Sequence, residues 1–333
     1  MTTELMPLPP LHIGAYPLEP ALILAPMAGL TDLPFRRLCR EFGASLAVAE
    51  MISADMQLWE TEKSRLRRAY AGEPRPHCAQ LLGADPQQMA LAAQRLVAEG
   101  VDIIDINMGC PVRKVQKRTA GAALLGDEAH IARLLQAVVN AVTVPVTLKI
   151  RLGVDPQRIN AVAVARQAQQ CGIAALSVHG RTLQCGYHGA VNHAAIGAVK
   201  AAVSIPVMAN GDIRSTHDAQ AMLHHTDAAG LMVGRGAHGR PWFFAQLAHF
   251  LRTGIHMPPP DRAQIAHTVQ RHLAAIHQFY GPEKGVLQAR AHLKGYVQQL
   301  QASPRWQHDL LTASCASQQQ ALLAAFLQTV ESA

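Results

Sequence analysis

Residues 101–111 read Val-Asp-Ile-Ile-Asp-Ile-Asn-Met-Gly-Cys-Pro. The first six form a β-branched, apolar run typical of a buried strand, and the run stops abruptly at Gly109-Cys110-Pro111. A basic segment, Arg113–Arg118, follows at once. A thiol is thereby placed at the carboxyl end of a strand beside positive charge, where the active sites of parallel α/β proteins form. A buried free cysteine explains the motif equally well, because Cys is among the most buried residue types.

Similar apolar runs recur along the chain and alternate with stretches of helical periodicity. Strands are predicted at Ala21–Ala25, Leu46–Ala49, Cys78–Leu82, Val101–Ile106, Val144–Ile150, Ala174–Val178, Ile205–Ala209 and Gly230–Val233, and helices at Pro86–Glu99, Glu128–Ala141, Ile159–Gln170 and Thr216–His225. Continuous apolar strands between amphipathic helices indicate a parallel sheet covered by helices. Eight units in roughly 230 residues favour an α/β fold of the (β/α)8 TIM barrel type over an open doubly wound sheet. We expect Leu11–Pro20 to form a hairpin or small lid before the first barrel strand.

The pattern changes at residues 253–260, where one glycine and three prolines indicate a linker. Beyond it the apolar spacing is helical only, at Arg262–Tyr280, Gln288–Gln301 and roughly Gln307–Val330. We therefore expect a barrel over residues 1–253, a linker over 254–260 and a C-terminal helical domain over 261–333. This helical domain either binds an anion through individual basic residues or is a helical cap that supports the barrel or a dimer.

The composition, 49% hydrophobic and 16% charged residues, is typical of a globular protein with a large core. No apolar run reaches the ~18 residues that span a bilayer, and the amino-terminal residues lack the basic and apolar regions of a signal peptide. The sequence therefore predicts a cytoplasmic protein. The six cysteines form no Cys-x-x-Cys pair, and His267, His272 and His277 share no face of a helix because they are five residues apart. We accordingly expect neither a disulfide framework nor a metal site.

The formal net charge of +7 favours an anionic partner. The basic residues are clustered at Arg36–Arg40, Lys63–Arg68 and Arg113–Arg118. A single basic cluster is usually just the solvent-exposed face of a helix. Three clusters near predicted strand-to-helix connections favour a polyanion.

Residues at the carboxyl ends of the predicted strands are the candidate site residues, because (β/α)8 barrels carry their active sites there. They are Pro26, Met27, Ala28, Gln80, Asn107, Cys110, Lys149, Arg151, His179, Arg181, Asn210, Gly211, Asp212, Gly234 and Arg235. Inside a closed barrel Lys149 needs an anionic or polar partner. The glycine turns after the last two strands can hold a phosphate. Amides and a lysine in one plane suit a heterocycle with carbonyl groups, such as a flavin or a pyrimidine.

Taken together, these motifs resemble those of the tRNA-dihydrouridine synthases, most closely the bacterial B-type enzymes. The matching segments cover nearly the whole chain and are Ala25–Gly29, Thr31-Asp32, Pro34–Arg36, Ala49–Met51, Gln80–Gly83, Asp105–Pro111, Lys114-Val115, Thr147–Arg151, His179–Thr182, Ala209–Ile213, Gly234-Arg235, Gly239–Trp242 and His277–Pro282. Each motif is modest alone, but their order and spacing are specific. Leu183 departs from the family, which usually has a basic residue there, and this weakens any inference about the tRNA position that is read.

The resemblance implies an FMN-dependent enzyme that reduces uridine to 5,6-dihydrouridine in tRNA, with NADPH reducing the flavin. The residues that would contact FMN are Pro26, Met27, Ala28, Gln80, Lys149, His179, Asn210, Gly211, Asp212, Gly234 and Arg235. The resemblance also implies that Asn107, Arg151 and Arg181 lie near the uracil or its backbone. Cys110 would be the catalytic acid, giving a proton to uracil C5 after hydride reaches C6. A thiol with an ordinary pKa near ~8.5 holds that proton at neutral pH. The helical domain would then bind tRNA.

Two other functions stay open. One is an FMN barrel dehydrogenase that acts on a free pyrimidine, and the basic clusters and the helical tail argue against it. The other is a non-catalytic RNA-binding protein on the same scaffold, which would leave Cys110 and Lys149 without a use. The expected partner is tRNA, with no membrane and no metal, and we expect the protein to act as a monomer.

Overall fold

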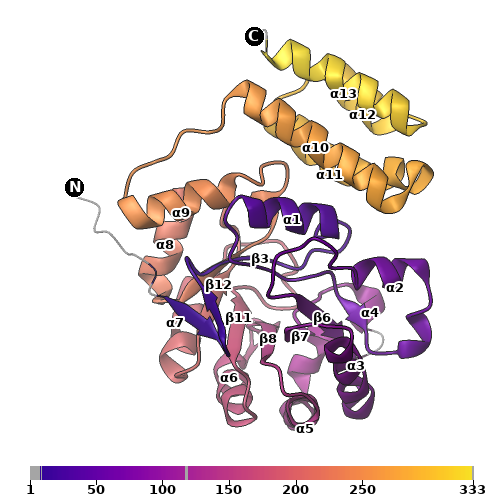
Figure 1. Ribbon diagram of the computed structural model, residues 1–333. Helices are drawn as coiled ribbons and strands as arrows, with labels where there is room; N and C mark the ends of the chain where they lie inside the picture. The colour runs from indigo at the N-terminus through magenta and orange to yellow at the C-terminus, as the bar shows by residue number, and fades with distance from the viewer. Residues whose placement is uncertain (1–7, 9, 117–118, 332–333) are drawn as a thin grey trace.

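Eight parallel strand positions close into a barrel in the computed structural model, which describes residues 8, 10–116 and 119–331 (Figure 1). The sheet order is β4-β3-β13-β12-β11-β8-β7-β6-β5, and its two end strands, Leu46–Ala47 and Ile52–Ser53, are halves of one barrel position. Between these halves Val48 bridges Cys78, and the amide of Ala49 donates to the Cys78 carbonyl at 3.0 Å. The circle is thereby closed, and the predicted (β/α)8 barrel is confirmed.

All eight predicted barrel strands are present with bounds that differ from the prediction by at most two residues, and one further strand, β5, was not predicted. They are β3 Leu22–Leu24, β4 Leu46–Ala47, β5 Ile52–Ser53, β6 Cys78–Leu82, β7 Ile103–Met108, β8 Val146–Arg151, β11 Ala175–His179, β12 Val207–Asn210 and β13 Gly230–Val233. β7 and β8 end later than predicted, so Asn107 and Arg151 lie on the strands themselves. Strand geometry, rather than loop geometry, thus fixes where these two side chains point.

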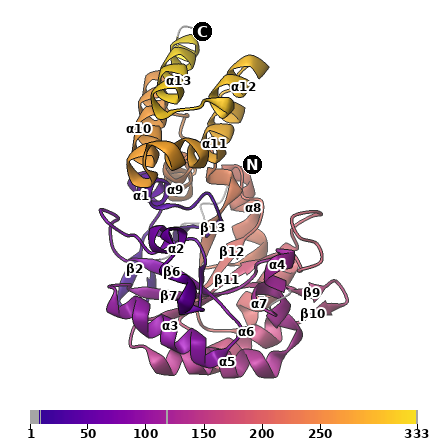
Figure 2. The same ribbon diagram turned by 90° about the vertical axis from the view of Figure 1, so that its right-hand side faces the viewer.

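Helices cover the outside of the barrel (Figures 1 and 2). Along the barrel part of the chain the α- and 3-10 helices are α1 Leu33–Glu41, η1 Met56–Leu58, α2 Glu62–Arg67, α3 Pro86–Ala98, α4 Arg113–Gln116, η2 Gly121–Gly126, α5 Glu128–Ala141, α6 Ala161–Gln170, α7 His193–Ala202, α8 Thr216–Thr226, η3 Arg235–Ala237 and α9 Phe243–Thr253. α5 illustrates why they form. Its N-cap Asp127 accepts a hydrogen bond from the amide of His130, and the buried residues Ile131, Leu135 and Val138 form one apolar stripe.

One predicted helix begins later than expected. Residues Gly153–Asp155 (β9) and Arg158–Ile159 (β10) form a small antiparallel hairpin beyond the end of β8. This hairpin takes Ile159 out of the predicted helix, which begins at Ala161 instead.

The hairpin of β1 (Leu11–Ile13) and β2 (Tyr16–Leu18) closes the amino-terminal end of the barrel. Its side chains Leu11, Ile13 and Leu18 are buried in one cluster with the first residues of the barrel strands. Fully burying a Leu or Ile contributes about 1.5–3 kcal/mol relative to leaving it exposed, so these residues hold the hairpin in place. The prediction of a hairpin is confirmed. It lies opposite the carboxyl ends of the strands and is no lid over them.

Beyond the linker the described chain forms four helices that stand above α1 (Figure 2). They are α10 Arg262–Tyr280, α11 Pro282–Gln299, α12 Pro304–Thr312 and α13 Ala316–Glu331. The second helix begins at Pro282 and not at the predicted Gln288, because proline is well accommodated in the first helical turn. The prediction of one long third helix is wrong: residues 313–315 separate α12 from α13.

These helices have a hydrophobic core of their own, separate from that of the barrel. Its buried members include Val269, Leu273, Leu293, Leu310 and Phe326. In the part of the chain that the structure describes, no helix is both long and apolar enough to span a membrane.

The tail rests on α1 through a mixed contact. The ring of Phe35 lies 5.6 Å from that of His272 and 5.3 Å from that of His292, centroid to centroid. At the edge of this contact Arg271 forms an ion pair with Glu41 at 2.5 Å. Aromatic packing and polar contacts therefore join the tail to the barrel.

Candidate active site

A cavity of about 410 Å³ lies at the carboxyl ends of the barrel strands. Fourteen of the fifteen candidate site residues line it: Pro26, Met27, Ala28, Gln80, Asn107, Cys110, Lys149, Arg151, His179, Asn210, Gly211, Asp212, Gly234 and Arg235. Arg181 is the exception. The sequence prediction thus named one continuous surface, although its members come from seven barrel positions.

Asn107 holds the turn that carries Cys110. Its Oδ1 accepts hydrogen bonds from the amides of Gly109 and Cys110, both at 3.0 Å. The Cys110 carbonyl in turn accepts from the amide of Ala122 at 3.2 Å. A side-chain oxygen that binds two successive amides fixes a tight turn, so the thiol is held in position by the end of its own strand. Cys110 itself is partly exposed at the cavity wall.

A buried polar row supports Asn107 from within the barrel. Its Nδ2 donates to Oε1 of Gln80 at 2.7 Å, and Gln80 donates to Asp105 at 2.6 Å. The other oxygen of Asp105 accepts from the hydroxyl of Thr147 at 2.6 Å. Burial raises the pKa of Asp105 and outweighs these hydrogen bonds and the nearby Lys149, which favour its charged form. Asp105 was not among the predicted site residues, although a carboxylate within an apolar strand is itself a signal, because it needs such partners.

Lys149 projects from β8 and donates to Oδ1 of Asn210 at 3.0 Å. Burial, together with the charge of Arg151, lowers the pKa of this ammonium to about 8 and outweighs the opposite effect of Asp105. At neutral pH Lys149 is therefore still charged, but its charge is poorly compensated by the protein. Such a group favours an anionic ligand in the cavity.

His179 lies among cations. Burial, with Lys149, Arg151 and Arg181 nearby, lowers its pKa to about 2. The imidazole is neutral at every physiological pH and presents a polar but uncharged group to the cavity.

Arg181 lies behind the cavity wall. Its guanidinium forms an ion pair with Asp212 and donates to the carbonyl of Gly189, and only 3% of the residue is exposed. On the cavity side Asp212 accepts from Arg235 at 2.6 Å. Burial acts to raise the pKa of Asp212, but these arginines, with Arg214, outweigh it and lower that pKa. Arg181 thus positions Asp212 and the loop after β11, and the structure does not bring it to the cavity.

Arg151 lines the cavity, yet its donors hold the surrounding loops. Nε donates to the carbonyl of Gly109 at 2.7 Å, and Nη1 donates to the carbonyl of Gly186 at 2.6 Å. Tyr187, which sequence reasoning missed, lies at the cavity wall with the Arg151 and Arg235 guanidinium carbons 5.4 and 5.1 Å from its ring centroid. No spacing pattern marks a lone tyrosine in a loop, so the sequence offered no signal for it.

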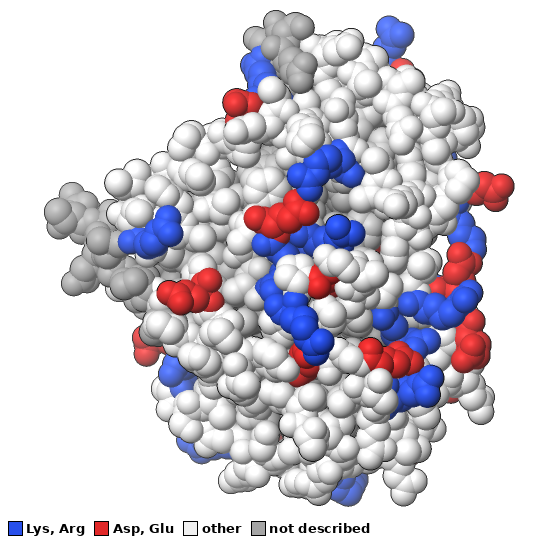
Figure 3. Space-filling view, in the orientation of Figure 1, with Lys and Arg blue, Asp and Glu red and all other residues white. Residues whose placement is uncertain are grey.

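A second cavity, of about 460 Å³, adjoins the first and shares Ala28 with it. It lies between α2 and the tail helices α10 and α11, and its lining includes Lys63, Tyr280 and Lys284. Lys284 also forms an ion pair with Glu62, which links the tail to the barrel across this groove. Figure 3 shows how Lys and Arg side chains on one face of the molecule are interleaved with Asp and Glu.

The predicted basic clusters are not all at the surface. Arg36 is fully buried and forms an ion pair with Glu73 at 2.8 Å, so it cannot face a partner. Arg37 and Arg113 are exposed. Residues 117–118 of the third cluster lie outside the described residues. The surface is thus less uniformly basic than the sequence suggested.

Comparison with known proteins identifies close relatives. The family model described as dihydrouridine synthase matches residues 23–331. The tRNA-dihydrouridine synthase B of Pseudomonas putida is 52% identical over 286 residues, which are 86% of this chain and 85% of that protein. The tRNA-dihydrouridine synthase B of Yersinia pestis is 45% identical over 320 residues, 96% of this chain and 100% of that protein.

Solved structures show a more distant likeness. A morphinone reductase superposes with a TM-score of 0.53 at 15% identity and covers 78% of this chain and 93% of its own. A 6-hydroxypseudooxynicotine amine oxidase from Pseudomonas geniculata gives 0.55 at 15% identity, with coverages of 75% and 50%. At this level of identity the likeness concerns the barrel fold alone.

Proposed function

Because the chain belongs to the dihydrouridine synthase family, we propose that it reduces uridine to 5,6-dihydrouridine in tRNA, with FMN as bound cofactor and NADPH as reductant. The observation that carries the proposal is the Cys110 turn, held by Asn107 at the wall of a cavity whose other side is cationic. We include in the proposal a monomer that works in the cytoplasm.

The residues of the cavity fit FMN. The turns after β12 and β13, with Arg235, present backbone and a guanidinium suited to a phosphate. Lys149 and Asn210 present a cation and an amide suited to the carbonyl edge of the isoalloxazine, while Met27 and Ala28 offer apolar contact. The residues that would hold the cofactor are Pro26, Met27, Ala28, Gln80, Lys149, His179, Asn210, Gly211, Asp212, Gly234 and Arg235. When bound, the flavin supplies the hydride that reaches uracil C6.

The protein's own part in the chemistry is proton delivery. As hydride arrives at C6, negative charge builds at C5 and on the C4 carbonyl oxygen. The Cys110 thiol gives its proton to C5, the new C–H bond forms, and the electron pair of the S–H bond stays on sulfur. The guanidinium of Arg151, held at the Gly109 carbonyl, favours the resulting thiolate, which regains a proton from solvent. Asn107 positions the thiol, and Arg181 acts through Asp212 and the loop after β11.

The proposed function is tested with bulk tRNA from a strain that lacks dihydrouridine. The purified protein is incubated with NADPH and this tRNA, and in parallel with free uridine and orotate. We expect dihydrouridine only in the tRNA, and a yellow protein with flavin absorbance. Turnover of the free bases alone would establish the free-pyrimidine dehydrogenase instead. A colourless protein that gains no flavin absorbance from added FMN would favour the non-catalytic RNA-binding protein.

We assign tRNA binding to the face shared by the barrel (1–253) and the helical domain (261–333), which the linker (254–260) joins. The groove between α2 and α11 supports this assignment, because it adjoins the cavity and its wall carries Lys63 and Lys284. A uridine inside folded tRNA must be turned out of its stack, at a cost of a few kcal/mol that contacts along such a groove can offset.

The double substitution Lys63→Gln and Lys284→Gln tests this assignment. We expect it to weaken tRNA binding by about 10-fold and to reduce the slope of log affinity against log salt by about 1–2, since Lys63, and Lys284 once it leaves Glu62, would each neutralise one phosphate. FMN binding should be unchanged. Filter binding at several salt concentrations measures both quantities.

The matched control is Lys200→Gln. Lys200 is in the last turn of α7, at the opposite end of the barrel. An affinity loss as large in this control as in the double variant would show a general effect of charge, and would remove the groove from the binding surface.

A further inference from the structure

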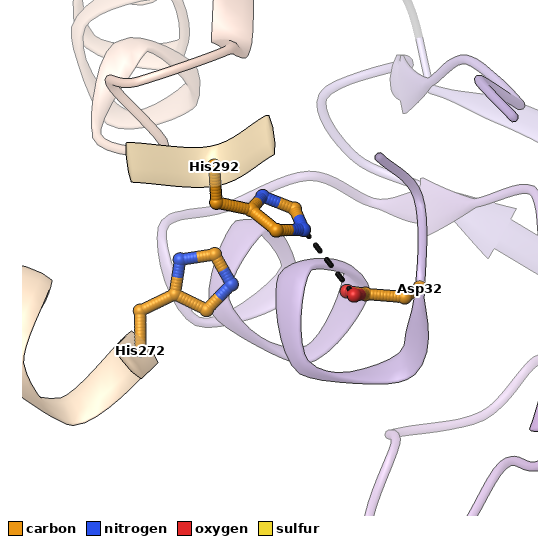
Figure 4. A group of neighbouring side chains, drawn as sticks. All are labelled: Asp32, His272 and His292. Atoms are coloured by element: carbon orange, nitrogen blue, oxygen red, sulfur yellow. Dashed lines mark hydrogen bonds and ion pairs between the residues drawn. The ribbon is translucent and has the colours of Figure 1, made fainter. Parts of the chain in front are cut away.

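Three buried side chains from distant parts of the chain meet between the barrel and the tail (Figure 4). Asp32 caps α1, while His272 lies on α10 and His292 on α11. One donor atom from each residue lies within 4.8 Å of the other two. The exposed fractions are 4% for Asp32 and 2% for each histidine, so water has little access to the cluster.

One donor in this cluster lacks a partner. The Nδ1 of His272 is hydrogen-bonded to the hydroxyl of Tyr296 at 2.8 Å, whereas its Nε2 is buried and makes no hydrogen bond. A buried polar atom without a partner is costly and uncommon. The Tyr296 contact also fixes the ring, as partners of the second nitrogen do for metal-binding histidines.

The geometry points to a site for one divalent transition metal ion of the zinc type, bound by Asp32, His272 and His292. Imidazole nitrogen and carboxylate oxygen are donors that zinc accepts, at about 2.0–2.2 Å, and two such donors on a tetrahedron lie about 3.3 Å apart. The Oδ2 of Asp32 and the Nε2 of His292 are already 3.2 Å apart. A small movement of the His272 ring toward the other two residues would give three ligands of a tetrahedral ion. The fourth ligand would be a water or the Tyr280 hydroxyl, which is 3.2 Å from the Oδ2 of Asp32.

The site differs in kind from the active site. None of its three residues lines the cavity at the carboxyl ends of the strands, and its ligands come from both the barrel and the tail. A metal ion there would couple its own binding to the docking of the tail on α1. The expectation of no metal rested on the absence of Cys-x-x-Cys pairs and on the histidines of one helix, whereas this cluster draws on two helices and the cap of a third.

Metal binding is tested on the full chain after treatment with a chelator. We expect the desalted protein to take up about one Zn²⁺ per chain by elemental analysis, and its Tm to rise with Zn²⁺ relative to EDTA. Co²⁺ should give visible d–d bands without the intense absorption of a thiolate complex. His272→Gln and His292→Gln should each weaken binding by at least roughly 10–100-fold, since even the loss of an outer partner costs that much.

The matched control is His225→Gln, an exposed histidine that stacks on His193. It should bind Zn²⁺ like the wild type. Binding that survives both cluster substitutions, or falls only in the control, shows a surface site and overturns the proposal. So does a wild-type protein whose metal content and Tm are the same with and without Zn²⁺, a result that does not depend on whether the variants fold.

Discussion

Cys110→Ala is expected to lower kcat for uridine reduction in tRNA by about 10²–10⁴-fold, the range that a positioned general acid contributes. The turn is fixed by hydrogen bonds from backbone amides to Asn107, and alanine leaves them intact. FMN and tRNA binding should therefore be unchanged, and the loss should fall on the chemical step. Single-turnover measurement of tRNA reduction by the pre-reduced enzyme isolates that step.

The control for this substitution is Cys185→Ala. Cys185 is also partly exposed, and its Sγ accepts a hydrogen bond from the Thr182 hydroxyl of the same loop. We expect its activity to stay within a few-fold of the wild type. Equal rates for Cys110→Ala and the wild type would mean that the thiol is only packed at the cavity wall and that another group donates the proton.

Lys149→Met is expected to lower kcat/KM by about 10²–10³-fold, the cost of removing one group aimed at developing charge. Methionine keeps most of the length of the side chain but removes the cation, and it leaves Oδ1 of Asn210 without its donor. Rates of flavin reduction by NADPH and of tRNA reduction, measured separately, show which half-reaction needs the charge. Lys200→Met, at the far end of the barrel, should be neutral in both.

The pKa of Lys149 also predicts the direction of a pH dependence. The pKa of Lys149 is about 8 in the free protein, so the charged form is present below that pH and is lost above it. The affinity of the cofactor-free protein for FMN should therefore fall as the pH rises through about 8. Lys149→Met should lack this descending limb. A variant as active as the wild type at pH 7, with the same profile, would exclude a role for the charge.

The barrel was predictable because its strands are buried on both sides. Largely apolar runs such as residues 101–106 and 174–178 contrast with the amphipathic helices between them. The predicted bounds of elements are wrong where the apolar pattern of strands and the amphipathic pattern of helices are not distinct. Ile159 continues an apolar pattern but pairs in a small hairpin, and residues 313–315 interrupt a polar helical stretch without a proline. Such breaks depend on tertiary contacts and have no local signal.

The candidate site was predictable to the extent that strand ends converge. Because Gln80, Lys149 and Asn210 lie on barrel strands, the barrel geometry brings them to one cavity independently of the loop conformations. It does not determine whether a side chain faces the cavity or supports it from behind, and Arg181 is of the second kind. The cluster of Asp32 with two tail histidines was beyond sequence reasoning, because only the docking of the tail brings it together.

The hairpin at the amino-terminal end has a kinetic consequence. It packs over the amino-terminal ends of the barrel strands, and among the described residues the cavity lies at the opposite, carboxyl end. Under the proposed function, the nicotinamide and the RNA would both reach the cofactor from that end. If they bind there in turn, we expect substituted-enzyme kinetics, with parallel double-reciprocal plots and mutual inhibition by the nicotinamide and the RNA at high concentration.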